Sequence, residues 1–171
     1  MVAKKKESTK KEVKLPRYLN LGSGNRPGDT KLGWINVDID KGCNPDVVRN
    51  LDKGLPFDTN SADYVRASHV IEHVDDVFWF MYEIWRVSKH DGTVEIIAPN
   101  HAHLMSIYAN HKRFIRPQYF DMWHPNYGNG AVMNVNQETF GAMFISLREE
   151  IVENSGAIRF VLKVIKNGVD Q

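Results

Sequence analysis

The sequence predicts an α/β protein, a three-layer sandwich built on a mostly parallel sheet and completed by a C-terminal antiparallel hairpin. From residue 18 onward, strand-like and helix-like apolar runs alternate, which is typical of parallel strands joined by crossovers. A glycine-rich turn, Gly22-Ser23-Gly24, follows the first strand-like run. The last two runs, residues 148–154 and 157–166, are separated only by Ser155-Gly156, and this spacing indicates a hairpin.

The strands expected before the hairpin occupy residues 18–21, 34–37, 46–51, 62–67 and 93–98, and the third of them is the weakest. The run at 93–98 is rich in β-branched residues and precedes a proline, so we expect a buried central strand there. In a parallel sheet, ligands bind at the edge where the carboxyl ends of the strands lie. That edge would carry the glycine turn, Asp38, Asn50, Ser68 and Pro99.

Residues 75–89 predict an amphipathic helix, because apolar residues recur there at spacings of three and four. The sequence His90-Asp91-Gly92 is expected to end this helix, with Gly92 in the left-handed conformation. The face toward the core would comprise Val77, Phe80, Met81, Ile84, Trp85 and Ser88.

The composition predicts one domain over residues 18–171, preceded by a disordered basic tail at residues 1–17. The tail holds seven basic and two acidic residues and the rest of the chain is mildly acidic, so no nucleic-acid-binding domain is expected. No apolar run is long enough to span a membrane, and the charged N-terminus lacks the apolar stretch of a signal peptide. Cys43 is the single cysteine, so no intrachain disulfide can form and a cytoplasmic location is expected.

The glycine turn and Asp38 together indicate a site for an adenosyl group. Glycines let the backbone approach a ligand closely, and a carboxylate at the end of the next strand can accept hydrogen bonds from both ribose hydroxyls. Asp40 is the neighbouring candidate for the same role. A dinucleotide oxidoreductase is not favoured, because Gly28 comes one residue too late for its glycine pattern and Asp38 follows Gly24 by only 14 positions.

Five segments then follow one another in an informative order: residues 19–27 (LNLGSGNRP), 37–40 (VDID), 46–57, 61–74 (SADYVRASHVIEHV) and 83–92. In this order they resemble the class I S-adenosylmethionine-dependent methyltransferases, in particular the small ones of bacteria and phages. The resemblance covers roughly residues 18–100. It implies a Rossmann-like fold, S-adenosyl-L-methionine as cofactor and S-adenosyl-L-homocysteine as product.

The resemblance also implies where the cofactor binds. The glycine loop would lie under the methionine part, Asp38 at the ribose, and Asn50 or Asp52 at the adenine. The family usually has acidic residues where this chain has Asn20 and Asn50. The implied cofactor-binding residues are Asn20, Gly22, Ser23, Gly24, Asn25, Asp38, Ile39, Asn50, Leu51, Asp52, Ser68 and His69.

The connection between the first two strands is too short for a full crossover helix. Backbone N–H groups of the glycine loop must therefore hold the methionine carboxylate without much helix dipole behind them. This predicts either a modest cofactor affinity or a site that is completed by the cap or by the second protomer of a homodimer.

Residues 100–135 are rich in aromatic residues and histidine without clear periodicity, which favours a short cap over the acceptor. His101 and His103 directly follow the fifth strand and are the catalytic candidates, as a general base or as groups that orient the acceptor. A metal site is not expected, because the spacing from these histidines to the later potential ligands His111, Asp121 and His124 fits no standard pattern.

The sequence leaves two interpretations open for each of two groups of residues. Glu72 and His73 cap and pack the start of the helix, or they take part in catalysis. Four aromatic residues line an acceptor pocket or form a hydrophobic cluster under the loop, namely Tyr119, Phe120, Trp123 and Tyr127.

The sequence therefore predicts methyl transfer from S-adenosyl-L-methionine to a small-molecule or sugar acceptor. The alternative is a cofactor-binding auxiliary or inactive methyltransferase-like module, which the substitutions at Asn20 and Asn50 would permit.

Overall fold

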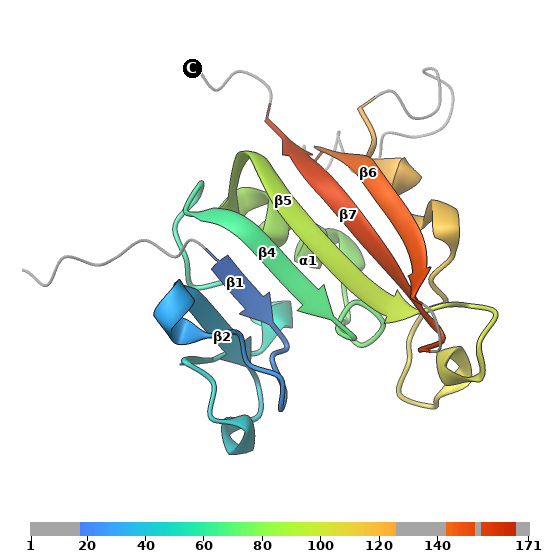
Figure 1. Cartoon of the computed structure of the whole chain (residues 1–171), viewed down its shortest axis with the longest axis horizontal. Coiled ribbons are helices and arrows are strands. Elements are labelled where there is room, and N and C mark those ends of the chain that lie inside the picture. The colour runs from blue at the N-terminus through green and yellow to red at the C-terminus, as the bar shows by residue number, and fades with distance from the viewer. Residues whose placement is uncertain (1–17, 126–142, 153–154, 167–171) are drawn as a thin grey trace, which may run out of the picture.

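The computed structural model describes residues 18–125, 143–152 and 155–166 (Figure 1). The predicted basic tail and Tyr127 lie outside these residues. Within the described ranges, seven strands form one sheet in the order β3-β2-β1-β4-β5-β7-β6. Their bounds are β1 Tyr18–Leu21, β2 Trp34–Asp38, β3 Val47–Val48, β4 Ala62–Ser68, β5 Ser88–Pro99, β6 Met143–Val152 and β7 Ala157–Ile165.

The sheet is parallel on one side and antiparallel on the other. Strand β1 pairs in parallel with β2 and β4, and the pairs β2–β3 and β4–β5 are also parallel. Strand β7 pairs antiparallel with β5 and with β6, as the spacing around Ser155-Gly156 predicts. The predicted Rossmann-like sheet with its C-terminal hairpin is thus confirmed.

Helix α1 (Val77–Val87) begins at Asp76, whose side chain accepts hydrogen bonds from the backbone N–H groups of Phe78 and Trp79. It ends earlier than the sequence predicts: Ser88 is its C-cap, and β5 starts at that residue. Asp91, not Gly92, has the left-handed conformation, with φ of 61°. The predicted capping role of Gly92 is therefore wrong. Gly92 lies inside β5, where a Cβ atom would come within 2.8 Å of the Lys89 carbonyl oxygen.

The apolar core lies between the sheet and two helical segments on one face, with α1 behind the sheet in Figure 1. The second segment is the 3-10 helix η5 (Pro117–Trp123), whose Phe120 and Trp123 are buried. The Phe120 ring centroid lies 4.7 Å from that of Phe160, and Trp123 packs against Phe78 of α1. Phe120 and Trp123 therefore belong to a hydrophobic cluster under the loop, which is one of the two interpretations that the sequence leaves open for them.

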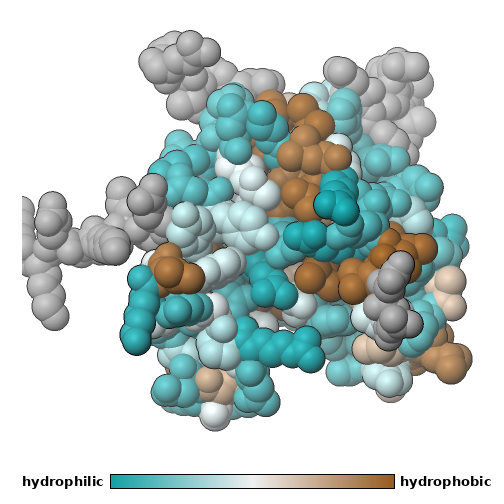
Figure 2. Space-filling model, in the orientation of Figure 1, coloured by the Kyte–Doolittle hydropathy of each residue, from teal (hydrophilic) through white to brown (hydrophobic). Residues whose placement is uncertain are grey.

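The opposite face of the sheet is polar at its centre. Glu95 of β5 accepts a hydrogen bond from the Tyr64 hydroxyl at 2.8 Å and pairs with Arg66 and Arg159. Helix α1 is the sole α-helix of the described residues, so within them this face carries no α-helical layer. The short connection between β1 and β2 explains this, since it contains only the 3-10 helix η1 (Thr30–Leu32). Figure 2 shows polar and apolar side chains intermixed on this face. No helix in the described ranges is long and apolar enough to cross a membrane.

Candidate functional site

The glycine loop bends sharply at the carboxyl end of β1. Gly22 and Gly24 both have positive φ, at 63° and 47°. The N–H groups of Gly22 and Ser23 donate to the carbonyl oxygen of Val37, which ties the loop to β2. A Cβ atom on Gly22 would lie 2.3 Å from Cγ2 of Val70. Only glycine fits there, because both the backbone conformation and the close approach exclude a side chain.

Asp38 ends β2 with its carboxylate turned back toward the loop. Its Oδ2 accepts a hydrogen bond from the Gly24 N–H at 2.7 Å, and its Oδ1 accepts one from the Asp40 N–H at 2.9 Å. Each oxygen keeps a second lone pair for a ligand. Asp40 instead is exposed and caps the 3-10 helix η2 (Lys41–Cys43) by accepting from the Gly42 N–H. The structure thus separates the two aspartates that the sequence leaves as alternatives.

Asn20 is buried beneath the glycine loop, where its amide group serves the loop itself. Its Nδ2 donates to the Asn36 side chain at 3.0 Å and to the Arg26 carbonyl oxygen at 3.2 Å. Asn36 in turn holds Gly28 through its side-chain oxygen. A carboxylate could not donate to either oxygen. Asparagine at this position, where the family usually has an acidic residue, therefore stabilises this particular loop.

Two neighbouring cavities open at the carboxyl ends of the parallel strands, and they share Gly22 and His69 as lining residues. The larger, of about 470 Å³, is lined among others by Asp38, Asn50 and Asp52. The smaller, of about 380 Å³, is lined by the glycine loop. All the residues that the resemblance implies as cofactor ligands line one or both: Asn20, Gly22, Ser23, Gly24, Asn25, Asp38, Ile39, Asn50, Leu51, Asp52, Ser68 and His69.

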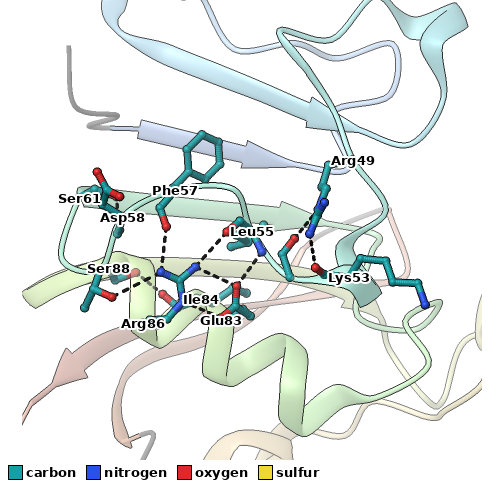
Figure 3. Close-up of polar contacts among 12 residues, drawn as sticks. Arg49, Lys53, Leu55, Phe57, Asp58, Ser61, Glu83, Ile84, Arg86 and Ser88 are labelled. Atoms are coloured by element: carbon teal, nitrogen blue, oxygen red, sulfur yellow. Dashed lines mark hydrogen bonds and ion pairs between the residues drawn. The ribbon is translucent and has the colours of Figure 1, made fainter. Parts of the chain in front are cut away.

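One wall of the larger cavity is formed by Arg49–Asp52, and α1 braces the segment 49–58 that carries this wall (Figure 3). Oε2 of Glu83 accepts the Leu55 N–H at 2.6 Å, while the Arg86 guanidinium donates to the carbonyl oxygens of Leu55 and Phe57. Arg86 also pairs with Glu83 at 2.6 Å, and Arg49 donates to the Gly54 carbonyl oxygen. Burial alone would raise the pKa of Glu83, but its hydrogen bonds to Arg86 and to the Leu55 N–H hold that pKa below the usual value.

Asn50 and Asp52, the alternatives for the adenine contact, both line the larger cavity. The side-chain oxygen of Asn50 accepts the Asp52 N–H at 2.9 Å and so caps the 3-10 helix η3 (Leu51–Lys53). Asp52 accepts the Asp75 N–H at 2.8 Å and links this wall to the turn before α1. Both side chains therefore help to build the wall, and both alternatives remain.

A third part of the site follows β4. His69 has a left-handed φ of 56°, and its Nδ1 lies 3.2 Å from Oε1 of Glu72, which is buried. The His73 ring lies 4.8 Å from the His111 ring, centroid to centroid. Glu72 thus has a hydrogen-bonded place in the site, although it does not line either cavity.

Residues of the irregular segment after β5 complete the cavities. Asn110 lines the larger cavity and Met105 the smaller. The sequence predicts a cap in this region without indicating these two positions, since no periodic pattern marks them. Sequence reasoning did not single out Arg49, Arg66, Val70 and Val74, which also line the cavities. His73, for which the sequence leaves two interpretations, lines the larger cavity, and Arg26 of the glycine loop lines the smaller.

His101 and His103, the predicted catalytic residues, line neither cavity. His103 caps the 3-10 helix η4 (Leu104–Ile107), because its Nδ1 accepts the Met105 N–H. Its ring also packs so closely on Gly156 that a Cβ atom there would lie 2.3 Å from it. His101 is exposed. The structure thus places neither histidine at these two cavities, and their catalytic role stays a prediction.

Comparisons with known proteins agree with this architecture. Residues 34–96 match the family model of the methyltransferase domain. No curated protein matches the chain. A chain of the Haloferax volcanii complex between the Trm112 methyltransferase activator and a methyltransferase has a TM-score of 0.60 and 15% identity, with 90% of this chain and 84% of that chain covered.

Two further solved structures are similar. A methyltransferase from Aquifex aeolicus that depends on S-adenosylmethionine has a TM-score of 0.54 and 13% identity, covering 88% of this chain and 85% of its own. The cyclase SpnF has a TM-score of 0.60 and 11% identity, covering 87% of this chain and 74% of its own. The chain has the class I methyltransferase fold, and S-adenosyl-L-methionine is the cofactor that the matched family indicates.

Proposed function

We propose that this chain, with its class I S-adenosylmethionine-dependent methyltransferase fold, methylates a small molecule or a sugar. One observation carries the proposal. The twelve residues that the resemblance implies as cofactor ligands, which are spread over residues 20–69, all line two cavities that meet at Gly22 and His69.

The residues present suit the cofactor. The carboxylate of Asp38 retains acceptor capacity at the end of β2, where two ribose hydroxyls could donate to it. In the smaller cavity, the buried Oγ of Ser23 has no hydrogen-bond partner among the described residues. A polar ligand such as the methionine carboxylate or amine would satisfy this hydroxyl. The bound cofactor supplies a methyl group on a sulfonium, and the protein contributes mainly proximity and alignment.

The size of the site supports a compact acceptor. Cavities of about 470 and 380 Å³ are within the usual range for small-molecule sites. An adenosyl group and a methionine would take up much of that space. The remainder suits a small molecule or one sugar ring, which would enter beside Arg66 and Met105 of the smaller cavity.

The alternative is an auxiliary or inactive module that binds the cofactor. The fold alone does not fix the reaction, because a similar fold belongs to a protein named as a cyclase. The similarity to a chain from a complex with an activator protein also makes a protein partner a reasonable alternative to a homodimer.

Calorimetric titration with S-adenosyl-L-methionine and S-adenosyl-L-homocysteine tests the proposal. We expect Asp38→Ala to weaken binding about 10- to 100-fold, since a hydrogen bond to a charged group contributes about 1.5–3 kcal/mol. Asp40→Ala is the matched control and should bind like the wild type, because Asp40 lines neither cavity. Equal affinities in the two variants would refute the ribose assignment. Tight binding without turnover on a panel of hydroxyl, amine and carboxylate acceptors would favour the auxiliary module.

A further inference from the structure

We propose that Glu72, His73 and His111 bind a divalent transition-metal ion beside the cofactor cavity. Each of these side chains offers one ligand atom, and the three atoms lie within 4.8 Å of one another. An ion with bonds of about 2.1 Å keeps its ligand atoms no more than about 4.2 Å apart. Small side-chain rotations would therefore bring the three atoms into bonding positions.

Two buried polar atoms in this cluster have nothing to bond to within the described ranges. They are Oε2 of Glu72, a residue only 1% exposed, and Nδ1 of His111. A buried carboxylate oxygen without a partner is costly, and native structures pair nearly all such atoms. A metal ion would satisfy both atoms at once. This pair of orphaned atoms is the observation that distinguishes the cluster from an ordinary helix cap.

The other polar atoms of the cluster are arranged as the outer contacts of a metal site usually are. A histidine that binds a metal through one ring nitrogen commonly donates the N–H of the other to a carbonyl oxygen. Nδ1 of His73 lies 3.2 Å from the Asn110 carbonyl oxygen, which leaves Nε2 as its ligand atom. Oε1 of Glu72 is likewise held by Nδ1 of His69 at 3.2 Å.

The backbone brings His111 to the other two ligands over a long stretch of chain. The Lys112 N–H donates to the Glu72 carbonyl oxygen at 2.8 Å, and the Arg113 guanidinium donates to the Ile71 carbonyl oxygen. The His73 N–H donates to Val70 and closes the turn after β4. These contacts fix the ligand-bearing segments against each other.

The donor set indicates the kind of ion. Two imidazoles and one carboxylate suit zinc, iron, cobalt or manganese, whereas calcium and magnesium prefer oxygen ligands. Three protein ligands leave at least one coordination position open, as in catalytic sites. His73 and Asn110 line the larger cavity, so the open position would serve a ligand bound there. If the proposed function holds, the adenosyl part of the cofactor occupies this cavity, and one of its oxygen or nitrogen atoms would fill that position.

The test is titration of the full chain, freed of metal by chelation, with Co²⁺ and Zn²⁺, followed by calorimetry and by the visible absorption of Co²⁺. We expect one saturable site per chain, with Mg²⁺ and Ca²⁺ unable to compete. Glu72→Gln and His111→Asn should each weaken binding at least tenfold. His90→Asn is the matched control and should bind like the wild type, since His90 lies at the amino-terminal end of β5.

Circular dichroism of each variant without metal checks that it folds. Should Glu72→Gln fail to fold, His111→Asn decides the matter, because it removes a ligand from an irregular segment. Absence of saturable binding, or equal binding by His111→Asn and His90→Asn, would overturn the proposal. Titration with S-adenosyl-L-homocysteine keeps the two proposals apart. If the chain binds S-adenosyl-L-homocysteine but no metal, only the metal site is refuted. If the chain binds metal but not S-adenosyl-L-homocysteine, only the proposed function is refuted.

Discussion

Two segments beside the cavities, here called the first and the second wall, are held in place in different ways. The first carries Arg49–Asp52 of the larger cavity, and the second carries Asn110 of the larger cavity and Met105 of the smaller. The first, residues 49–58, is braced from within by Glu83 and Arg86 of α1, which bond its backbone directly. The second, residues 105–113, rests on the turn before α1 mainly through Lys112 and Arg113. Lys112 pairs with Asp75 at the surface, and the second wall exposes Ile107 and Tyr108.

This difference assigns different properties to the two sides of the site. A wall fixed by a buried charged pair keeps its shape and suits a cofactor that is the same in every reaction cycle. A wall held by surface contacts opens at little cost, because exposed ion pairs contribute little to stability. We therefore expect the cofactor side to be preformed and the side of residues 105–113 to adjust to the acceptor.

The largest effect is expected from Arg86→Met, which would remove the brace of the first wall. Glu83 would then remain buried without its partner, and breaking such a pair costs about 3 kcal/mol. Urea unfolding followed by circular dichroism measures this loss. The double variant Glu83→Gln/Arg86→Met should lose less than the sum of the single losses, since no uncompensated charge remains. Additive losses would show that the brace does not act as a unit.

A smaller effect, about 1–3 kcal/mol, is expected from Gly22→Ala, because a side chain there meets both a positive φ and Val70. Gly156→Ala is the matched change in the β6–β7 hairpin, with φ of 64° and the His103 ring at 2.3 Å. Thermal melts should show comparable destabilisation of both variants. Only Gly22→Ala should also weaken binding of S-adenosyl-L-homocysteine, and a weakening by both would mean that the hairpin shapes the cofactor site.

Much of the fold was predictable, because its local patterns agree with its tertiary contacts. The strand-like runs at 18–21, 34–37 and 62–67 became β1, β2 and β4 nearly residue for residue. The end of the helix was not predictable, because it depends on strand pairing. Ser88 begins β5, where it pairs with Ala62 of β4. That pairing takes the chain away from the expected cap at Gly92.

The candidate site also has a part that was predictable from the sequence and a part that was not. The predictable part comprises residues at strand ends or turns, namely Gly22, Asp38 and Asn50. Their spacing in the sequence therefore indicates that they lie close together in the folded chain. His111 reaches Glu72 only through backbone hydrogen bonds of an irregular segment, and no periodicity records such contacts. The surroundings of His103 were not predictable for a similar reason, because its ring packs on Gly156 of the distant hairpin.

A pH effect sharpens the comparison further. The pKa of Glu83 is lower in the folded chain than in the unfolded chain, so its contribution to stability is present above the ordinary glutamate range. As the pH falls through that range toward the lowered pKa, the unfolded chain takes up the proton first and the contribution is lost. Urea midpoints measured from about pH 6 to about pH 3 should therefore fall less steeply for Glu83→Gln than for the wild type. Parallel slopes would contradict the lowered pKa.

The smallest change in stability is expected from Lys112→Met, which removes the surface pair with Asp75 from the second wall. The Lys112 backbone N–H still reaches Glu72 in this variant, and Arg113 still donates to Ile71. The urea midpoint should therefore be the same as that of the wild type.

Hydrogen exchange is the sensitive measurement for this variant, because it reports local opening that global unfolding does not. Amides of residues 105–113 should exchange faster in Lys112→Met, while those of residues 49–58 keep the wild-type rate. Faster exchange in both walls would mean that they open together, and the acceptor side could not then adjust independently of the cofactor side.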